Sequence, residues 1–165
     1  MFSAGEKIVY GQTGVCVIED IAEKELIKNQ KRLYYVLKPL NQQNNIIYAP
    51  ADSDKIFIRP VMTREEAEKL ILQIPEIVSK IKQGVLSVDD YREKLSSRKS
   101  LELIELTAII YEKKKIAKSN KKKLGFSDEK YMHIAENMLF GELAVSLDIP
   151  IEQVPGYIEN KLKNL

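Results

Sequence analysis

The sequence is poor in the residues that build disulfides, metal sites and membrane spans. Cys16 is the only cysteine and His133 the only histidine, so we expect neither an internal disulfide nor a zinc site. No apolar run approaches the ~20 residues that a membrane span needs. The first seven residues lack the basic, apolar and small-residue regions of a secretory signal. These absences predict a protein of the reducing cytoplasm without a membrane partner.

Catalytic motifs are also scarce. The sequence has no GxxxxGKS/T loop for phosphates and no GxSxG nucleophile turn. His133 falls in an amphipathic helical pattern, and the carboxylates are spread along helical faces, where solvation and pairing explain them. We therefore expect no enzyme activity, no cofactor and no metal. A hydrolase or nuclease would need carboxylates brought together from distant helices.

Positive charge is concentrated in one part of the chain. The net charge is only +2, which gives no general argument for nucleic-acid binding. Residues 92–123, however, contain eleven lysines and arginines against four acids, whereas residues 128–165 contain three lysines against seven acids. Such a basic segment could orient the protein on DNA, and lysines at 113–123 could follow phosphates without sequence preference. The alternative is that these lysines only solvate exposed helix faces.

The first sixty residues predict short strands joined by polar turns. The β-prone runs cover residues 7–10, 15–21, 33–37, 46–49 and 56–60. Alternation places Val15 and Val17 on one face, with Ile21 as a further candidate for that face. Five such strands predict a small SH3-like or Tudor-like β-barrel.

After Pro60 the hydrophobic period becomes helical. Thr63-Arg64-Glu65-Glu66 predicts a capping box at the start of a helix that ends near Pro75. Further helices are expected at about 77–84, 87–95, from 100 onward, at 127–143 and at 150–162. Leu101 is expected on the inward face of the helix that begins at residue 100, and Pro155 is expected to kink or break the last helix. The sequence thus predicts the α+β class with two domains, a β-barrel over residues 1–61 and an all-α bundle over residues 62–165.

One surface of the expected barrel combines aliphatic, aromatic and basic residues. Ile46, Ile47 and Tyr48 could form an exposed edge strand near Lys24. An edge with unpaired amides can take up a strand of another protein, which is β-augmentation. The alternative is that Ile46 or Ile47 points into the barrel and neighbouring loops cover the edge.

An ordered series of short motifs resembles the CarD/CdnL family of bacterial transcription regulators. The series begins with Gly5-Glu6-Lys7-Ile8-Val9-Tyr10, Gly14-Val15 and Ile18-Glu19-Asp20-Ile21. It continues with Tyr34-Tyr35-Val36-Leu37-Lys38, Tyr48-Ala49-Pro50 and Ile58-Arg59-Pro60-Val61. Near the other end, Glu129, Met138-Leu139 and Gly141-Glu142-Leu143-Ala144 are also similar to that family. The likeness is weakest between residues 75 and 106.

The resemblance implies a partner for each domain. Members of the family carry an amino-terminal RNA polymerase-interaction domain, shared with the transcription-repair coupling factor, which pairs with the β subunit. Their helical domain lies at the upstream edge of the transcription bubble and stabilises the open promoter complex. By position, the resemblance implies a polymerase-binding site at Lys24, Ile46, Ile47, Tyr48 and Pro50. It implies contacts with promoter DNA, nonspecific and to the backbone, at Ser87, Arg92, Lys94, Arg98 and Lys130.

Two positions depart from the family's pattern. Tyr48 stands where a basic residue is common, so an aromatic contact would replace a charged one. Ser87 stands where many relatives have a tryptophan that wedges into the minor groove, and this chain has no tryptophan. Leu86 could replace that wedge only in part.

Two functions therefore remain open from the sequence. The first is a transcription regulator that binds the polymerase and promoter DNA as a monomer in the functional complex. The second is an interaction adaptor that binds the polymerase or another protein without engaging DNA.

Overall fold

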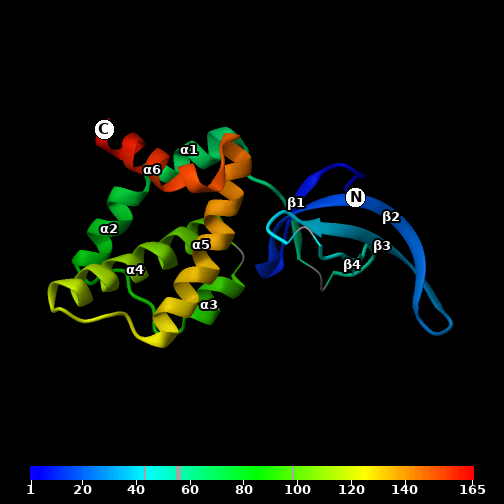
Figure 1. The fold of residues 1–165 in the computed structure, drawn as a ribbon, viewed down its shortest axis with the longest axis horizontal. Coiled ribbons are helices and arrows are strands. Elements are labelled where there is room, and N and C mark those ends of the chain that lie inside the picture. The colour runs from blue at the N-terminus through cyan, green and yellow to red at the C-terminus, as the bar shows by residue number, and fades with distance from the viewer. Residues whose placement is uncertain (43, 55–56, 98) are drawn as a thin grey trace. The chain divides into compact units, whose positions relative to one another are not determined.

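The chain divides into two compact units, Met1–Val61 and Met62–Leu165, in a computed structural model (Figure 1). The structure describes residues 1–42, 44–54, 57–97 and 99–165. The first unit is an antiparallel sheet and the second is helical, which confirms the predicted α+β class.

The first unit is built on one antiparallel sheet of five strands. Their order across the sheet is β4-β3-β2-β1-β5, so β4 and β5 are its two edges. The 3-10 turn Gly11–Thr13 joins the first two strands. The strands are β1 (Lys7–Tyr10), β2 (Gly14–Ile27), β3 (Gln30–Pro39), β4 (Ile47–Pro50) and β5 (Ile58–Pro60). Ile56, expected to begin the fifth strand, lies outside the described residues.

Strands β2 and β3 form a long hairpin with an irregularity at Glu19. The register passes from Ile18↔Leu37 to Asp20↔Val36, so one residue of β2 is left without a partner. Such a bulge exchanges the two faces of the strand beyond it. Ile21 therefore packs with Cys16 and Ile18 on the core, and the expectation that it shares a face with Val15 and Val17 is wrong.

The core of the sheet draws on all five strands. Its buried members are Ile8, Cys16, Ile18, Tyr35, Leu37 and Ala49. Ile47 from β4 and Ile58 from β5 pack against the same cluster, so both edges of the sheet face one core. Burial raises the pKa of the Cys16 thiol to about 11, which keeps it protonated and unreactive near neutral pH. The closed Tudor-like barrel stays a prediction.

The second unit contains six α-helices in its described residues. They are α1 (Arg64–Leu72), α2 (Ile74–Lys82), α3 (Tyr91–Ser96), α4 (Ser100–Ser119), α5 (Phe126–Leu147) and α6 (Val154–Lys163), the last preceded by a 3-10 turn at Ile151–Gln153. The two long helices, α4 and α5, pack against each other, and the shorter helices surround them (Figure 1). None of the helices in the described ranges is both long and apolar enough to cross a membrane.

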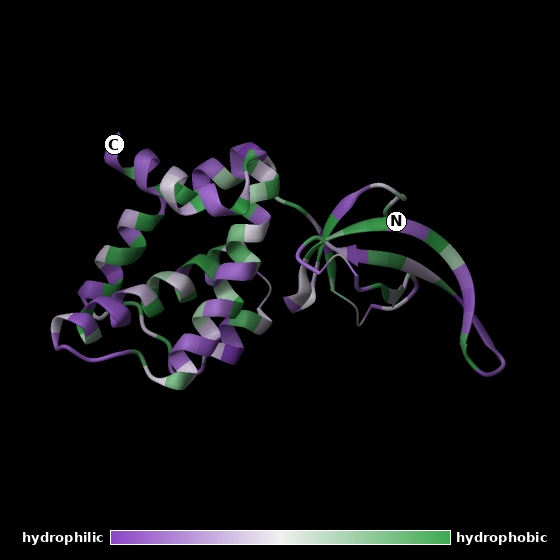
Figure 2. Ribbon diagram, viewed as in Figure 1, coloured by the Kyte–Doolittle hydropathy of each residue, from purple (hydrophilic) through white to green (hydrophobic). Residues whose placement is uncertain are grey.

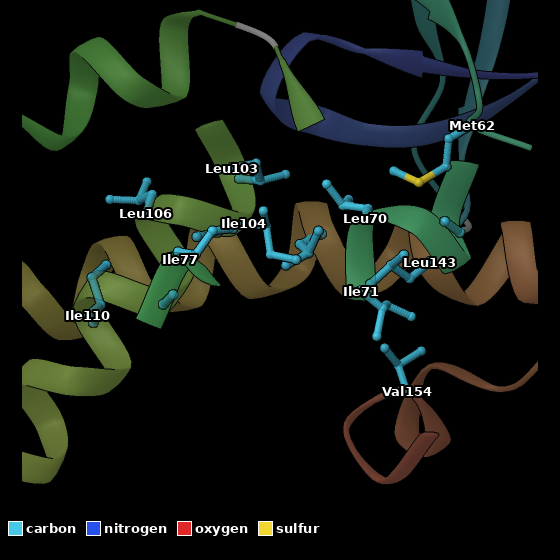
Figure 3. Packing of buried hydrophobic residues seen from close by; sticks show 14 of the residues in the cluster. Met62, Leu70, Ile71, Ile77, Leu103, Ile104, Leu106, Ile110, Leu143 and Val154 are labelled. Atoms are coloured by element: carbon cyan, nitrogen blue, oxygen red, sulfur yellow. The ribbon is translucent and has the colours of Figure 1, made fainter. Parts of the chain in front are cut away.

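Aliphatic side chains from most of the helices meet in one core. Ile71 of α1, Leu143 of α5 and Val154 of α6 lie close together, while Ile77, Ile104 and Ile110 continue the cluster along α2 and α4 (Figure 3). On the short helices α1 and α2 apolar residues recur every three or four positions, which gives each of these two helices an apolar stripe (Figure 2). Burial of these stripes stabilises helices that are individually too short to persist in water.

The starts of α3, α5 and α6 differ from the expected ones, because these helices are capped at other residues. The third helix begins at Tyr91 rather than near Ser87, because the Asp90 carboxylate accepts a hydrogen bond from the Arg92 amide and caps it. The fifth begins at Phe126, with Gly125 rather than Ser127 at the cap position. Pro155 lies in the first turn of α6, where no intrahelical amide donor is required, so it starts that helix rather than breaking it.

The inward face of α4 also differs from the expectation. Leu101 is exposed, whereas Leu103, Leu106 and Ile110 are buried. This helix is covered on more than one side, because α2, α3 and α5 all contact it. A single inward stripe therefore does not describe it.

The capping box at Thr63 should make a measurable contribution to stability. The Thr63 hydroxyl accepts from the Glu66 amide at 3.2 Å, and the Glu66 carboxylate accepts from the Thr63 amide at 2.7 Å. We expect Thr63→Ala to lower the free energy of unfolding of the helical unit by about 1 kcal/mol, because the helix loses its cap. Urea unfolding followed by circular dichroism measures the change. Thr63→Ser is the matched control, and an alanine variant as stable as the serine variant would contradict this role.

Candidate functional site

Strand β4 and the residue before it, Ile46, turn one face to the core and the other to solvent. Ile47 packs against the core of the sheet, so the predicted pair Ile46 and Ile47 divides between the two sides. Ile46 and Tyr48 lie on the outer side, with 44% and 42% of their surface exposed. The edge is therefore both apolar and accessible.

The backbone of β4 offers hydrogen-bonding groups at this edge. The Ala51 amide donates to the Leu33 carbonyl at 2.9 Å, which sets the phase of the ladder with β3. Hydrogen-bonded and non-hydrogen-bonded pairs alternate in an antiparallel ladder, so the peptide groups of Ala49 and Ile47 turn toward β3. The amide and carbonyl of Tyr48 consequently turn outward. Across the described ranges, no backbone hydrogen bond outside the ladder engages them.

Lys24 of β2 lies above the Tyr48 ring of β4, although β3 separates the two strands in the sheet. The Lys24 ammonium is 5.3 Å from the ring centroid, a cation–π contact. The structure thus brings together two of the residues that the sequence assigned to polymerase binding. Pro50, at the end of β4, lines a shallow pocket of about 220 Å³ with Phe2 and Tyr35.

Arg32 belongs to the same surface and was missed from the sequence. It is paired with Lys24 across the β2–β3 hairpin, which places both side chains on one face. Its guanidinium is 2.7 Å from Asp52, and this hydrogen bond lowers the pKa of the Asp52 carboxyl. In the sequence, Lys24 and Arg32 are nearly equally far from the Lys28-Asn29 turn, on opposite sides of it. In a hairpin this spacing makes two residues neighbours, so it could have predicted that Arg32 lies beside Lys24.

A cleft of about 520 Å³ lies beside α3, and Arg92, one of the candidate DNA-binding residues, is part of its lining. Tyr91, at the start of α3, also lines the cleft and is held by residues of α4 and α5. The Tyr91 hydroxyl donates to the Asp128 carboxylate at 2.5 Å and accepts from the Lys113 ammonium at 2.5 Å. Burial, followed by the bond to Asp128, raises the pKa of Tyr91. This network fixes the short helix α3 on the two long helices.

Arg92 lies on the solvent side of this cleft and remains accessible. Its guanidinium is 3.3 Å from the Asp90 carboxylate, whose pKa it lowers through a side-chain hydrogen bond. Asp90 therefore offsets part of the Arg92 charge. Lys130 is also exposed, with its ammonium 5.8 Å from the centroid of the Tyr131 ring, and Tyr131 lines the same cleft.

Lys94 has a partner inside the helical unit. Its ammonium is 2.7 Å from the Glu105 carboxylate, and the two side chains are only 15% and 19% exposed. This ion pair joins α3 to α4. A contact between Lys94 and DNA would require the ammonium to leave Glu105.

The remaining predicted DNA contacts lie in the segments that flank α3. Ser87 is exposed in the connection between α2 and α3. Leu86 packs against the helical core, so it is held away from the role of a wedge. Arg98 lies outside the described residues. No cluster of three or more potential metal ligands occurs among residues 1–42, 44–54, 57–97 and 99–165.

The amino-terminal unit has a recognisable family. Residues 2–62 match the family of the CarD-like/TRCF RID domain. The amino-terminal unit is therefore a domain of this family, which indicates an RNA polymerase-interaction domain and supports the resemblance found in the sequence. No protein with a curated description matches the chain.

Proposed function

We propose that this protein regulates transcription by binding the β subunit of RNA polymerase and stabilising the open promoter complex. The family match over residues 2–62 carries the proposal, because it indicates a polymerase-interaction domain. The helical unit would lie on DNA at the upstream edge of the bubble. The protein would act without catalysis, as a monomer in the cytoplasm, and its sheet would belong to the Tudor-like barrels.

The exposed edge of β4 supports docking by β-augmentation. A strand of the β subunit could pair with the outward amide and carbonyl of Tyr48, while Ile46 and the Tyr48 ring cover the added strand. Lys24 and Arg32, on the same sheet, would favour a partner surface with negative charge. Main-chain pairing would supply affinity, and these side chains would supply specificity.

Stabilisation of the open complex requires differential binding. A protein that binds the open complex more tightly than the closed one by ~1.4 kcal/mol raises the equilibrium between them about tenfold. Phosphate contacts at Arg92, Lys130 and Ser87 would contribute to this difference only where opening changes the path of the DNA. The same stabilisation could activate one promoter and slow escape from another.

The adaptor without DNA contact is the second candidate function. Two observations favour it. Arg92 and Lys94 both have carboxylate partners within the protein, and the chain has no tryptophan to wedge into an opened step.

Charge reversal on the edge surface should weaken polymerase binding. We expect wild-type protein to retrieve core RNA polymerase in affinity capture, and Lys24→Glu to bind it at least about tenfold more weakly, because a like charge would face the acidic partner surface. Lys31→Glu is the matched control, since it makes the same charge change on the neighbouring strand at a residue that faces the other side of the sheet. Failure of the wild type to retrieve the polymerase would refute the proposed partner.

Charge reversal beside α3 separates the regulator from the adaptor. We expect the double variant Arg92→Glu, Lys130→Glu to shorten the lifetime of the open promoter complex. The slope of the logarithm of the binding constant against the logarithm of the salt concentration should also become shallower, by about one for each lost phosphate contact. Lys94 is left unchanged, since Lys94→Glu would place two carboxylates together and destabilise α3. Lys82→Glu, on the exposed end of α2, is the control. An unchanged lifetime in the double variant, with polymerase still bound, would favour the adaptor.

A further inference from the structure

The connection between α4 and α5 has an unbalanced positive charge. Residues 113–127 contain seven lysines and no acid. Lys113 is bound to Tyr91, and Lys115 is 3.3 Å from Glu112. The other five, which are Lys114, Lys118, Lys121, Lys122 and Lys123, are exposed and have no ion pair within the described part of the chain. Figure 2 shows the hydrophilic colour along this lysine-rich stretch.

The turn that carries these lysines has a defined shape. The Lys122 amide donates to the Ala117 carbonyl at 2.7 Å and the Lys121 amide donates to the Lys118 carbonyl at 3.0 Å, which is a Schellman motif at the end of α4. Lys121 occupies the left-handed position, with φ of 56°, where glycine is the usual residue. The chain thus keeps a positive charge at a position where glycine would be conformationally easier.

An exposed aromatic side chain follows this turn. Phe126 is the first residue of α5, and 86% of its surface is accessible to solvent. No aromatic or cation–π partner of Phe126 occurs in the described ranges, and the buried stripe of α5 begins only at Met132. The packing of the helical unit therefore gives no reason for a phenylalanine here. The next residue, Ser127, lines the cleft that also contains Arg92.

We propose that residues 113–126 bind unpaired nucleic acid, with the lysines on phosphates and the Phe126 ring stacked on a base. Lysines that face solvent without carboxylate partners can neutralise phosphates. An aromatic ring can stack only on a base whose face is uncovered, as in a single strand or at an opened step of a duplex. The proposal depends on the proposed function in one respect only: the proposed function says that such nucleic acid would be met at the edge of the transcription bubble.

The same charge could attract an anionic lipid surface, but the apolar surface here is small for that role. An interfacial helix buries a continuous apolar face in the lipid. Here Leu124 packs against the helical core, and Glu129 and Lys130 follow on the first turn of α5. One phenylalanine beside five unpaired lysines fits base stacking and phosphate contact better.

Binding of the full chain to labelled oligonucleotides tests the proposal without polymerase. We expect fluorescence anisotropy to show tighter binding to a duplex with an unpaired stretch than to the fully paired duplex. Phe126→Ala should weaken binding to the opened duplex about tenfold, at the low end of what one stacked base contributes, and leave binding to the paired duplex almost unchanged. Because Phe126 is exposed, the variant should keep the thermal stability of the wild type.

Two further variants separate stacking from charge. Phe126→Trp introduces the only tryptophan of the chain, and its emission should be quenched by the opened duplex but not by the paired one. Lys122→Glu should weaken binding to both duplexes and reduce the salt dependence, whereas Lys82→Glu, on α2, should change neither.

Three outcomes would overturn the proposal: equal binding of Phe126→Ala and wild type to the opened duplex, an unquenched tryptophan in Phe126→Trp, or binding to phosphatidylserine vesicles without binding to nucleic acid. Affinity capture of polymerase by Phe126→Ala distinguishes this failure from failure of the proposed function. If Phe126→Ala captures the polymerase and also binds the opened duplex as tightly as the wild type, only the role of Phe126 is refuted. If the wild type captures no polymerase, the proposed polymerase partner is refuted.

Discussion

The choice of which β4 residues form hydrogen bonds with β3 determines which backbone groups the amino-terminal unit can offer to a partner. The Ala51 amide bonds to Leu33, and this directs the peptide groups of Ile47 and Ala49 inward. The Tyr48 peptide is left outward, in the same strand that places Ile47 on the core. A shift of one residue would turn Ile46 and Tyr48 toward the core and direct the peptide groups of Ile47 and Ala49 outward instead. Core packing and partner binding therefore depend on one register.

The helical unit shows a second dependence, on polar contacts that hold a very short helix. Helix α3 has six residues, too few to be stable alone. Tyr91 binds Asp128 and Lys113, and Lys94 binds Glu105, so both ends of α3 are tied to the long helices. These contacts position Arg92 at the cleft. They also occupy Lys94, which a reading of charge alone would leave available for DNA.

The sequence predicted the elements better than it predicted the surfaces. Within the described residues, strand propensity and helical period predict the central part of each strand and helix. The capping box at Thr63 is predictable because its two hydrogen bonds are local in sequence. The bulge at Glu19 could not be predicted, because pairing with β3 determines it and alternation within β2 carries no sign of it. Likewise, Lys94 and Glu105 are eleven positions apart, and only the packing of α3 on α4 brings them together. The sequence alone does not suggest base stacking, because Tyr111 and Phe126 are the only aromatic residues among the lysines of residues 111–126. The exposure of Phe126 depends on where α5 begins, which only the structure gives.

Amide hydrogen exchange at β4, with and without core RNA polymerase, tests the central claim most directly. If a strand of the polymerase pairs with this edge, the Tyr48 amide should exchange quickly in the protein alone and become strongly protected in the complex, because it gains a hydrogen bond. The Ala49 amide, already directed toward β3, should change much less. A Tyr48 amide that exchanges at the same rate in a confirmed complex would contradict docking through the edge of β4.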